Sequence, residues 1–153
     1  MEWMTLASTL VGGAIATVSA GYLDRRRWRR DRIDQQTEAR RVLYGTYLAN
    51  LSQARLVFSR LARDADASDV ERRKAAWDAF DPCSGLRYQM TISAPKTVVE
   101  PAEDVYRTLR ELRNAVADGL MLESGDYAEH RSRYDTALGA LRAAMRDDLG
   151  ADA

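Results

Sequence analysis

WMTLASTLVGGAIATVSAGYL, residues 3–23, is the longest stretch of the chain without a charged side chain, and DRRRWRR follows it directly at residues 24–30. As a helix, its 21 residues would rise about 31 Å, close to the roughly 30 Å of hydrocarbon in a bilayer. A buried helix of a soluble bundle is the competing interpretation, but such helices rarely lack charges over this length. The stretch therefore predicts a transmembrane anchor at residues 1–24.

The charges around the anchor predict its orientation. A cleaved signal peptide carries its basic residues before the apolar run, whereas here only Met1 and Glu2 precede it and the arginines follow. Small residues at 18–20 would suit cleavage, but this charge order opposes it. Because basic flanks stay on the cytoplasmic side, we expect a single-pass protein of the cell membrane. Its N-terminus lies outside, and residues 25–153 form a cytoplasmic helical-bundle domain.

Small residues recur along one side of the predicted anchor helix at intervals of four. Such ridges let the backbones of two membrane helices approach closely. The pattern predicts a homo-oligomer, or pairing with another membrane protein. The expected packing residues are Ser8, Gly12, Gly13, Ala16 and Ala20.

A juxtamembrane arginine collar at residues 25–41 follows the anchor. Residues 24–41 hold eight arginines and four acids, a local charge of +4, although the whole chain has no net charge. Beside a membrane, each basic residue gains about 1 kcal/mol from anionic headgroups. Because membrane topology already explains the collar and no base-reading motif accompanies it, we expect no nucleic-acid partner. The expected lipid contacts are Arg25, Arg26, Arg27, Trp28, Arg29 and Arg30.

Helical periodicity dominates the rest of the chain. Apolar residues return every three or four positions from Ile33 to Leu61, which suits a bundle seam or a short coiled coil. No proline or glycine interrupts residues 22–44, so this helix should continue from the anchor as a stalk. The expected core residues include Leu51, Phe58, Leu109, Leu112 and Leu141.

A second helix should begin at a capping box formed by Ser68 and Glu71. It should end near Pro82, because the residue before a proline avoids helical dihedral angles. Residues 86–92 alternate as a strand would, but without a partner strand we expect one or two helical turns there. The residues expected to face the core are Val70, Ala76, Trp77 and Phe80.

The third helix can begin at two places. It begins either at Pro95, with Pro101 kinking its interior, or near Glu100, with Pro101 in its first turn. A fourth helix should run from Ser124 to about Leu149. The expected fold is all-α, with a transmembrane helix continuing into a stalk and a small antiparallel helical bundle.

Side chains suited to catalysis are sparse. His130 is the only histidine, and Asp126 and Glu129 beside it do not complete a set of metal ligands. Cys83 is the only cysteine and has no base close in sequence, which fits a reducing compartment better than a thiol nucleophile. We therefore expect no enzyme, no cofactor, and no catalytic or metal-binding residue.

Through its anchor, its arginine collar and residues 94–105, the chain resembles small actinobacterial single-pass membrane proteins with a helical cytoplasmic domain. That resemblance implies no established activity. We expect a membrane-tethered interaction or scaffold module that contacts an unknown cytoplasmic protein at the membrane face. The alternative is an oligomeric membrane effector whose anchor helices assemble to permeabilise the membrane, as the hydroxyl groups of Thr5, Thr9 and Thr17 would allow.

Overall fold

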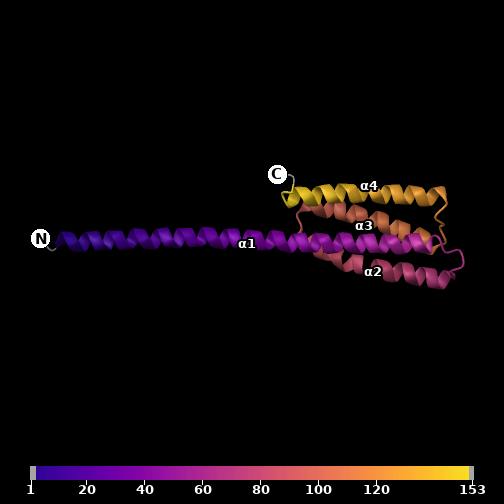
Figure 1. Cartoon of the computed structure of the whole chain (residues 1–153), viewed down its shortest axis with the longest axis horizontal. Coiled ribbons are helices and arrows are strands. Elements are labelled where there is room, and N and C mark those ends of the chain that lie inside the picture. The colour runs from indigo at the N-terminus through magenta and orange to yellow at the C-terminus, as the bar shows by residue number, and fades with distance from the viewer. Residues whose placement is uncertain (1–2, 152–153) are drawn as a thin grey trace. The chain divides into compact units, whose positions relative to one another are not determined.

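A computed structural model describes residues 3–151 of the chain, and side chains from residue 32 to residue 151 (Figure 1). The described chain is helical, without strands, which confirms the all-α fold. The chain divides into two units, Met1–Ala39 and Arg40–Ala153, and the second contains the bundle and its core. The helices are α1 (Trp3–Leu61), α2 (Asp69–Ser93), α3 (Lys96–Ala117) and α4 (Gly125–Asp148).

The predicted anchor and residues 25–31 of the collar lie outside the described side chains. Among residues 32–151, whose side chains the structure describes, no helix is both long enough and apolar enough to cross a membrane. The side chains predicted to pack the anchor or to contact lipid lie outside this range: Ser8, Gly12, Gly13, Ala16, Ala20, Arg25, Arg26, Arg27, Trp28, Arg29 and Arg30.

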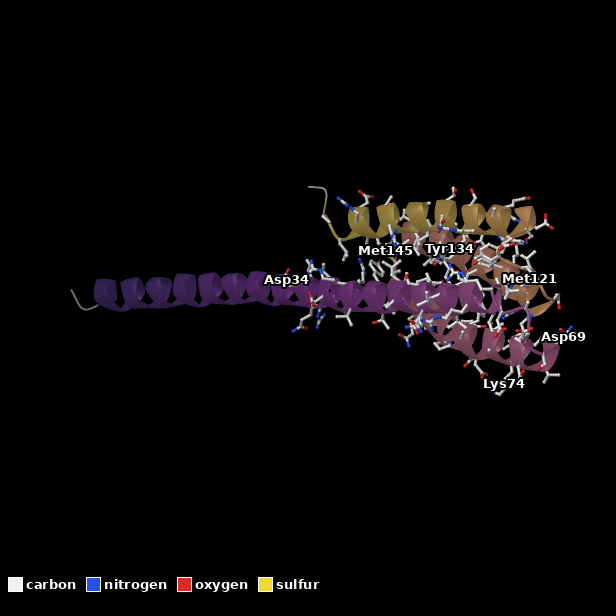
Figure 2. The ribbon with its side chains drawn as sticks, turned by 45° about the vertical axis from the view of Figure 1, so that its right-hand side comes forward. Asp34, Asp69, Lys74, Met121, Tyr134 and Met145 are labelled. Carbon is white, nitrogen blue, oxygen red and sulfur yellow. The ribbon has the colours of Figure 1, made fainter. Side chains whose placement is uncertain are left out.

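Within the second unit, residues 40–61 of α1 form an antiparallel bundle with α2, α3 and α4 (Figure 1). Short connections impose this arrangement, since each helix must turn back along its predecessor. Tyr134 and Met145 of α4 are buried, whereas Asp69 and Lys74 of α2 point into solvent (Figure 2). The predicted core is confirmed, because these side chains are fully buried: Leu51, Phe58, Leu109, Leu112 and Leu141.

The capping box of α2 is confirmed. The Ser68 side chain accepts a hydrogen bond from the Glu71 amide, and the Glu71 carboxylate accepts one from the Ser68 amide. The predicted end of this helix was wrong, because α2 continues through Pro82 to Ser93 and contains residues 86–92. Burial of Cys83 and Met90 beyond the proline offsets the hydrogen bond that proline cannot donate.

Two residues expected in the core of α2 are exposed. Ala76 and Phe80 are buried as predicted, but Val70 is 79% exposed and Trp77 is 57% exposed. The buried stripe continues from Phe80 to Cys83, which fixes the face of α2 that packs inward. At about 100° per residue, Val70 and Trp77 lie roughly a third of a turn from that stripe.

The third and fourth helices start at recognisable signals. α3 begins at Lys96, directly after Pro95, so the first of the two predicted starts is confirmed and Pro101 lies inside the helix. The side-chain oxygen of Ser124 caps α4 by accepting a hydrogen bond from the amide of Tyr127. This cap places the ring of Tyr127 in the first turn of α4, facing α1.

A buried arginine closes the end of the bundle where α1 stops. Arg72 is 4% exposed, and its Nη1 donates to the carbonyl oxygen of Leu61 at 3.2 Å. Its Nη2 donates to the carbonyls of Asp64 at 2.9 Å and Ala67 at 3.3 Å. Arg72 thereby supplies donors to carbonyls in the turn after α1, where the Leu61 carbonyl also accepts from the Asp64 amide at 3.3 Å.

The other end of the bundle is held by a polar cluster. Arg40 Nη1 lies 3.2 Å from Asp148 Oδ1, and Arg40 Nε donates to the Ser93 carbonyl at 3.1 Å. The Tyr44 hydroxyl donates to Asp148 Oδ2 at 2.7 Å. Burial, together with this hydrogen bond, raises the pKa of Tyr44 well above its ordinary range. The seam between α1 and α4 is therefore fixed at this end.

Candidate functional site

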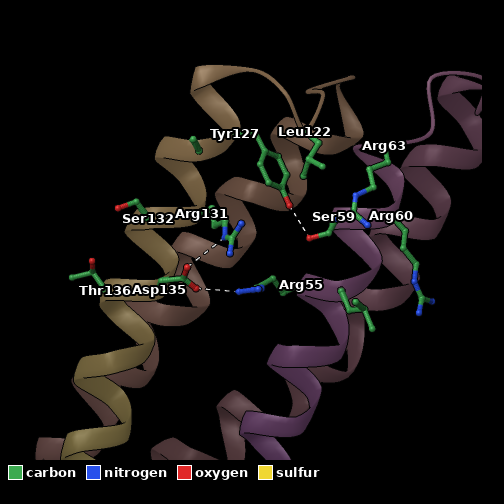
Figure 3. Close-up of a pocket in the computed structure, with 12 residues that line it drawn as sticks. Arg55, Ser59, Arg60, Arg63, Leu122, Tyr127, Arg131, Ser132, Asp135 and Thr136 are labelled. Atoms are coloured by element: carbon green, nitrogen blue, oxygen red, sulfur yellow. Dashed lines mark hydrogen bonds and ion pairs between the residues drawn. The ribbon is translucent and has the colours of Figure 1, made fainter.

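A cleft of about 960 Å³ opens between α1 and α4 (Figure 3). It lies in the half of the bundle that ends at the α1–α2 connection, and we call it the arginine cleft. Both walls belong to the second unit of the chain. The lining residues are Arg55, Leu56, Ser59, Arg60, Arg63, Leu122, Tyr127, Ala128, Arg131, Ser132, Asp135 and Thr136.

Four of these lining side chains are arginines and one is a carboxylate. Asp135 contacts two of them: Arg55 Nη1 lies 3.1 Å from its Oδ1, and Arg131 Nε lies 3.6 Å from its Oδ2. Among the described residues, Arg60 and Arg63 have no ion-pair partner. Arg63 extends beside Ser59, whereas Arg60 stands at the outer rim (Figure 3). The cleft therefore carries a local charge of +3.

Hydroxyl groups extend the set of hydrogen-bond donors. Ser59 and Tyr127 share a hydrogen bond of 2.8 Å across the cleft, and Ser132 and Thr136 lie on the α4 wall. Guanidinium and hydroxyl groups together suit a carboxylate or a phosphate, because arginine can donate two parallel hydrogen bonds to either. The lining contains neither histidine nor cysteine. This chemistry suits binding of an anion rather than nucleophilic attack.

A second hollow, of about 370 Å³, extends the cleft along the same two helices. It shares Arg55, Leu56, Ser59 and Asp135 with the arginine cleft. We call it the extension. The residues found only there are Ser52, Tyr134, Leu138 and Arg142.

Tyr134 connects the extension to the core. Its side chain is fully buried, and its hydroxyl has no hydrogen-bond partner among the described residues. Burial raises the pKa of Tyr134 to about 12, so the hydroxyl stays protonated at neutral pH. Arg55 Cζ lies 6.0 Å from the centre of the Tyr134 ring, a distance at which a cation is still weakly attracted to an aromatic face.

The two residues singled out earlier for reactive chemistry lie elsewhere. His130 is half-buried and lines a hollow of about 460 Å³ with Asp118, Asp126 and Glu129. Among the described residues, no group of three or more His, Cys, Asp and Glu side chains could hold a metal ion. Cys83 is fully buried, and burial raises its pKa to about 11, which keeps the thiol protonated.

Reasoning from the sequence missed the arginine cleft. Its walls come from two segments about 70 residues apart, and neither segment resembles a known motif. One signal was present: both segments place arginines between their apolar positions, and neighbouring antiparallel helices would bring these arginines together. The chain matches no known family model, no curated protein sequence and no solved structure.

Proposed function

We propose that this chain is a membrane-held adaptor. Its N-terminal segment keeps it at the cytoplasmic face of the membrane, and its arginine cleft binds an acidic segment of a partner protein. The observation that carries the proposal is the charge of the cleft, which is lined by four arginines and one carboxylate.

Basic side chains on other faces of the bundle illustrate why this charge matters. Several pair with an acid close by: Lys74 with Asp78 on α2, and Arg107 with Asp104 on α3. Such pairs leave no local excess of charge and contribute little to stability. The cleft differs because Asp135 cannot neutralise all of its arginines.

An acidic protein segment suits the cleft better than a small anion does. A volume of about 960 Å³ accommodates several side chains, and the apolar Leu56 and Leu122 lie among the arginines. Charged rims of this kind steer an oppositely charged partner and select against others. Their contribution falls as salt rises, since partly exposed charges are screened.

The tether supports the same function through effective concentration. Residues 3–23 and the arginines that follow them support membrane attachment with a cytoplasmic C-terminus. Holding the cleft at a membrane would raise its encounters with partners confined to that surface. A periplasmic reporter fused after Ala153 should therefore be inactive, and sodium carbonate should leave the chain in the membrane fraction.

Binding of a fluorescent glutamate-rich peptide to the full-length chain in mild detergent tests the cleft. Arg63→Glu combined with Arg131→Glu reverses one charge on each wall and should weaken binding by at least about tenfold. The matched control is Arg107→Glu with Arg110→Glu on the exposed face of α3. Each pair contains one arginine that has an ion-pair partner and one that has none among the side chains of residues 32–151. Equal weakening by both pairs would contradict the proposal, because net charge alone would then explain binding.

A further inference from the structure

The arginine cleft and its extension form one elongated groove. They share four lining residues, so the groove continues along α1 from Ser52 to the end of the helix at Leu61 and reaches Arg63 in the turn that follows. From Ser52 to Leu61 the helix rises about 14 Å, and Arg63 lies two residues farther along the chain. A groove of this length between two helices fits a segment of polypeptide.

Charge and apolar surface alternate along this groove. Arg63 lies toward one end, and Arg142 lines the other end beside Ser52. Between them Leu56 is 46% exposed and lines both hollows. The groove therefore has a cationic side chain at each end, with Leu56 and the ion pair of Arg55 with Asp135 between them.

The hydrogen-bonding groups of the groove are mostly donors. Arginine side chains donate and cannot accept, and the hydroxyls of Ser59 and Tyr127 are already paired with each other. An extended peptide presents backbone N–H groups that need acceptors. The groove offers these at Asp135, which already pairs with Arg55 and Arg131, and at the hydroxyls of Ser52, Ser132 and Thr136, fewer than its donors. A helix satisfies its own backbone and presents only side chains.

The geometry points to an acidic amphipathic helix of a partner protein as the occupant of this groove. This inference rests on the proposed function and specifies the partner. Such a helix would lie along α1 and α4 with its apolar face inward, as helices do in grooves of other proteins. Carboxylates at its two ends would contact Arg63 and Arg142, and an apolar residue between them would contact Leu56.

The spacing on α1 gives the spacing expected on the partner. Leu56 lies four residues from Ser52 on α1 and seven residues before Arg63, which follows the end of the helix by two residues. In a partner helix, positions separated by four, seven or eleven residues share one face. The partner should therefore place acids at positions i and i+11, with apolar residues at i+4 or i+7. Because the partner helix can lie parallel or antiparallel to α1, a test peptide with leucine at both i+4 and i+7 covers both directions.

Two synthetic helical peptides of identical composition test this arrangement. The first carries glutamates at i and i+11 with leucines at i+4 and i+7, and the second moves the glutamates to the opposite face. Anisotropy with the full-length chain in mild detergent should show the first binding about tenfold more tightly. Leu56→Asp and Arg142→Glu should each weaken the first peptide at least about fivefold, while Arg110→Glu should not.

A charge exchange checks the register. Replacing one terminal glutamate of the first peptide by lysine should restore part of the binding that Arg142→Glu removes, because the pair is then reversed rather than lost. Circular dichroism should show unchanged helix content in the Leu56→Asp and Arg142→Glu variants, since both side chains are exposed.

Three results would overturn the inference, and they separate it from the proposed function. Equal affinity for the two peptides would exclude a defined helix face. Tighter binding of a proline-containing acidic peptide would show an extended occupant. In both cases the adaptor function stands if Arg63→Glu with Arg131→Glu still weakens binding. If that pair of substitutions changes nothing, both proposals fail.

Discussion

At the scale of single residues, two buried tyrosines differ in whether their hydroxyl groups are hydrogen-bonded. Tyr47 and Tyr134 are both fully buried in the bundle. The Tyr47 hydroxyl donates to the carbonyl of Ala102 at 3.2 Å, whereas the Tyr134 hydroxyl has no partner among the described residues. A buried hydroxyl costs free energy unless it is hydrogen-bonded, so the two side chains should contribute differently to stability.

Removing each hydroxyl in turn measures this difference. Tyr47→Phe should lower the free energy of unfolding by about 1 kcal/mol, because it removes a buried hydrogen bond. Tyr134→Phe should be neutral or stabilising by up to about 1 kcal/mol, because it removes only an unpaired polar group. Urea denaturation followed by circular dichroism measures both. Equal losses would show that Tyr134 has a hydrogen-bond partner in solution.

Burial of these groups also predicts sensitivity to alkali. It raises the pKa of Tyr134 from 10.0 to about 12 and that of Cys83 from 9.0 to about 11. The folded chain therefore holds these protons at pH values where the unfolded chain releases them. This contribution to stability is complete below about pH 9 and is lost as pH rises to about 12.

Urea denaturation at a series of pH values tests the alkaline loss. The free energy of unfolding should fall as pH rises above about 9, and Tyr134→Phe should make the fall above pH 10 shallower. Tyr44 and Tyr47 shift in the same direction, so part of the fall should persist. An unchanged slope in the variant would show that Tyr134 titrates normally in the folded chain.

At the scale of helices, local signals predicted the starts better than the ends. Ser68 and Ser124 cap α2 and α4 as expected, because a cap depends only on residues within one turn. Pro82 gave the wrong end for α2. Proline costs about 3 kcal/mol inside a helix, and only tertiary burial of Cys83 and Met90 beyond it could outweigh that cost.

The alternation of apolar and polar residues at 86–92 also reflects how α2 packs in the bundle. Met90 is buried and Leu86 partly so, whereas Tyr88 and Ile92 are exposed on another face of the same helix. Because apolar residues occupy two faces of this helix, they occur at every second position, which is the spacing expected of a strand. The arginine cleft was beyond prediction for a related reason, since Arg55 and Arg131 meet only after α4 packs beside α1.

The end of α1 provides a prediction at the same scale. Arg72→Leu removes the donors to three carbonyls and should lower the free energy of unfolding by about 3 kcal/mol or more. Arg73→Leu is the matched control, because Arg73 is exposed and only 3.6 Å from Asp118 in a surface ion pair. Its effect should be below about 1 kcal/mol. Denaturation midpoints compare the two variants directly, and equal effects would contradict a capping role for Arg72.

At the scale of the whole molecule, the proposed function assigns membrane attachment and partner binding to two different segments of the chain. In the proposed function, membrane attachment is assigned to residues 3–23 and the collar, while every residue of the arginine cleft belongs to Arg40–Ala153. If the two tasks are independent, substitutions should separate them. The proposed adaptor needs both, because a cleft without a tether loses its effective concentration at the membrane.

Two variants of the full chain should therefore lose different properties. Deleting residues 1–24 should move the protein to the soluble fraction while leaving its affinity for an acidic peptide within about twofold of the full chain. Arg63→Glu with Arg131→Glu should do the reverse, keeping the protein in carbonate-washed membranes while weakening peptide binding. Fractionation and anisotropy measure the two properties separately. If the deletion also abolished peptide binding, the N-terminal segment would be part of the binding site, and the division between tether and cleft would be wrong.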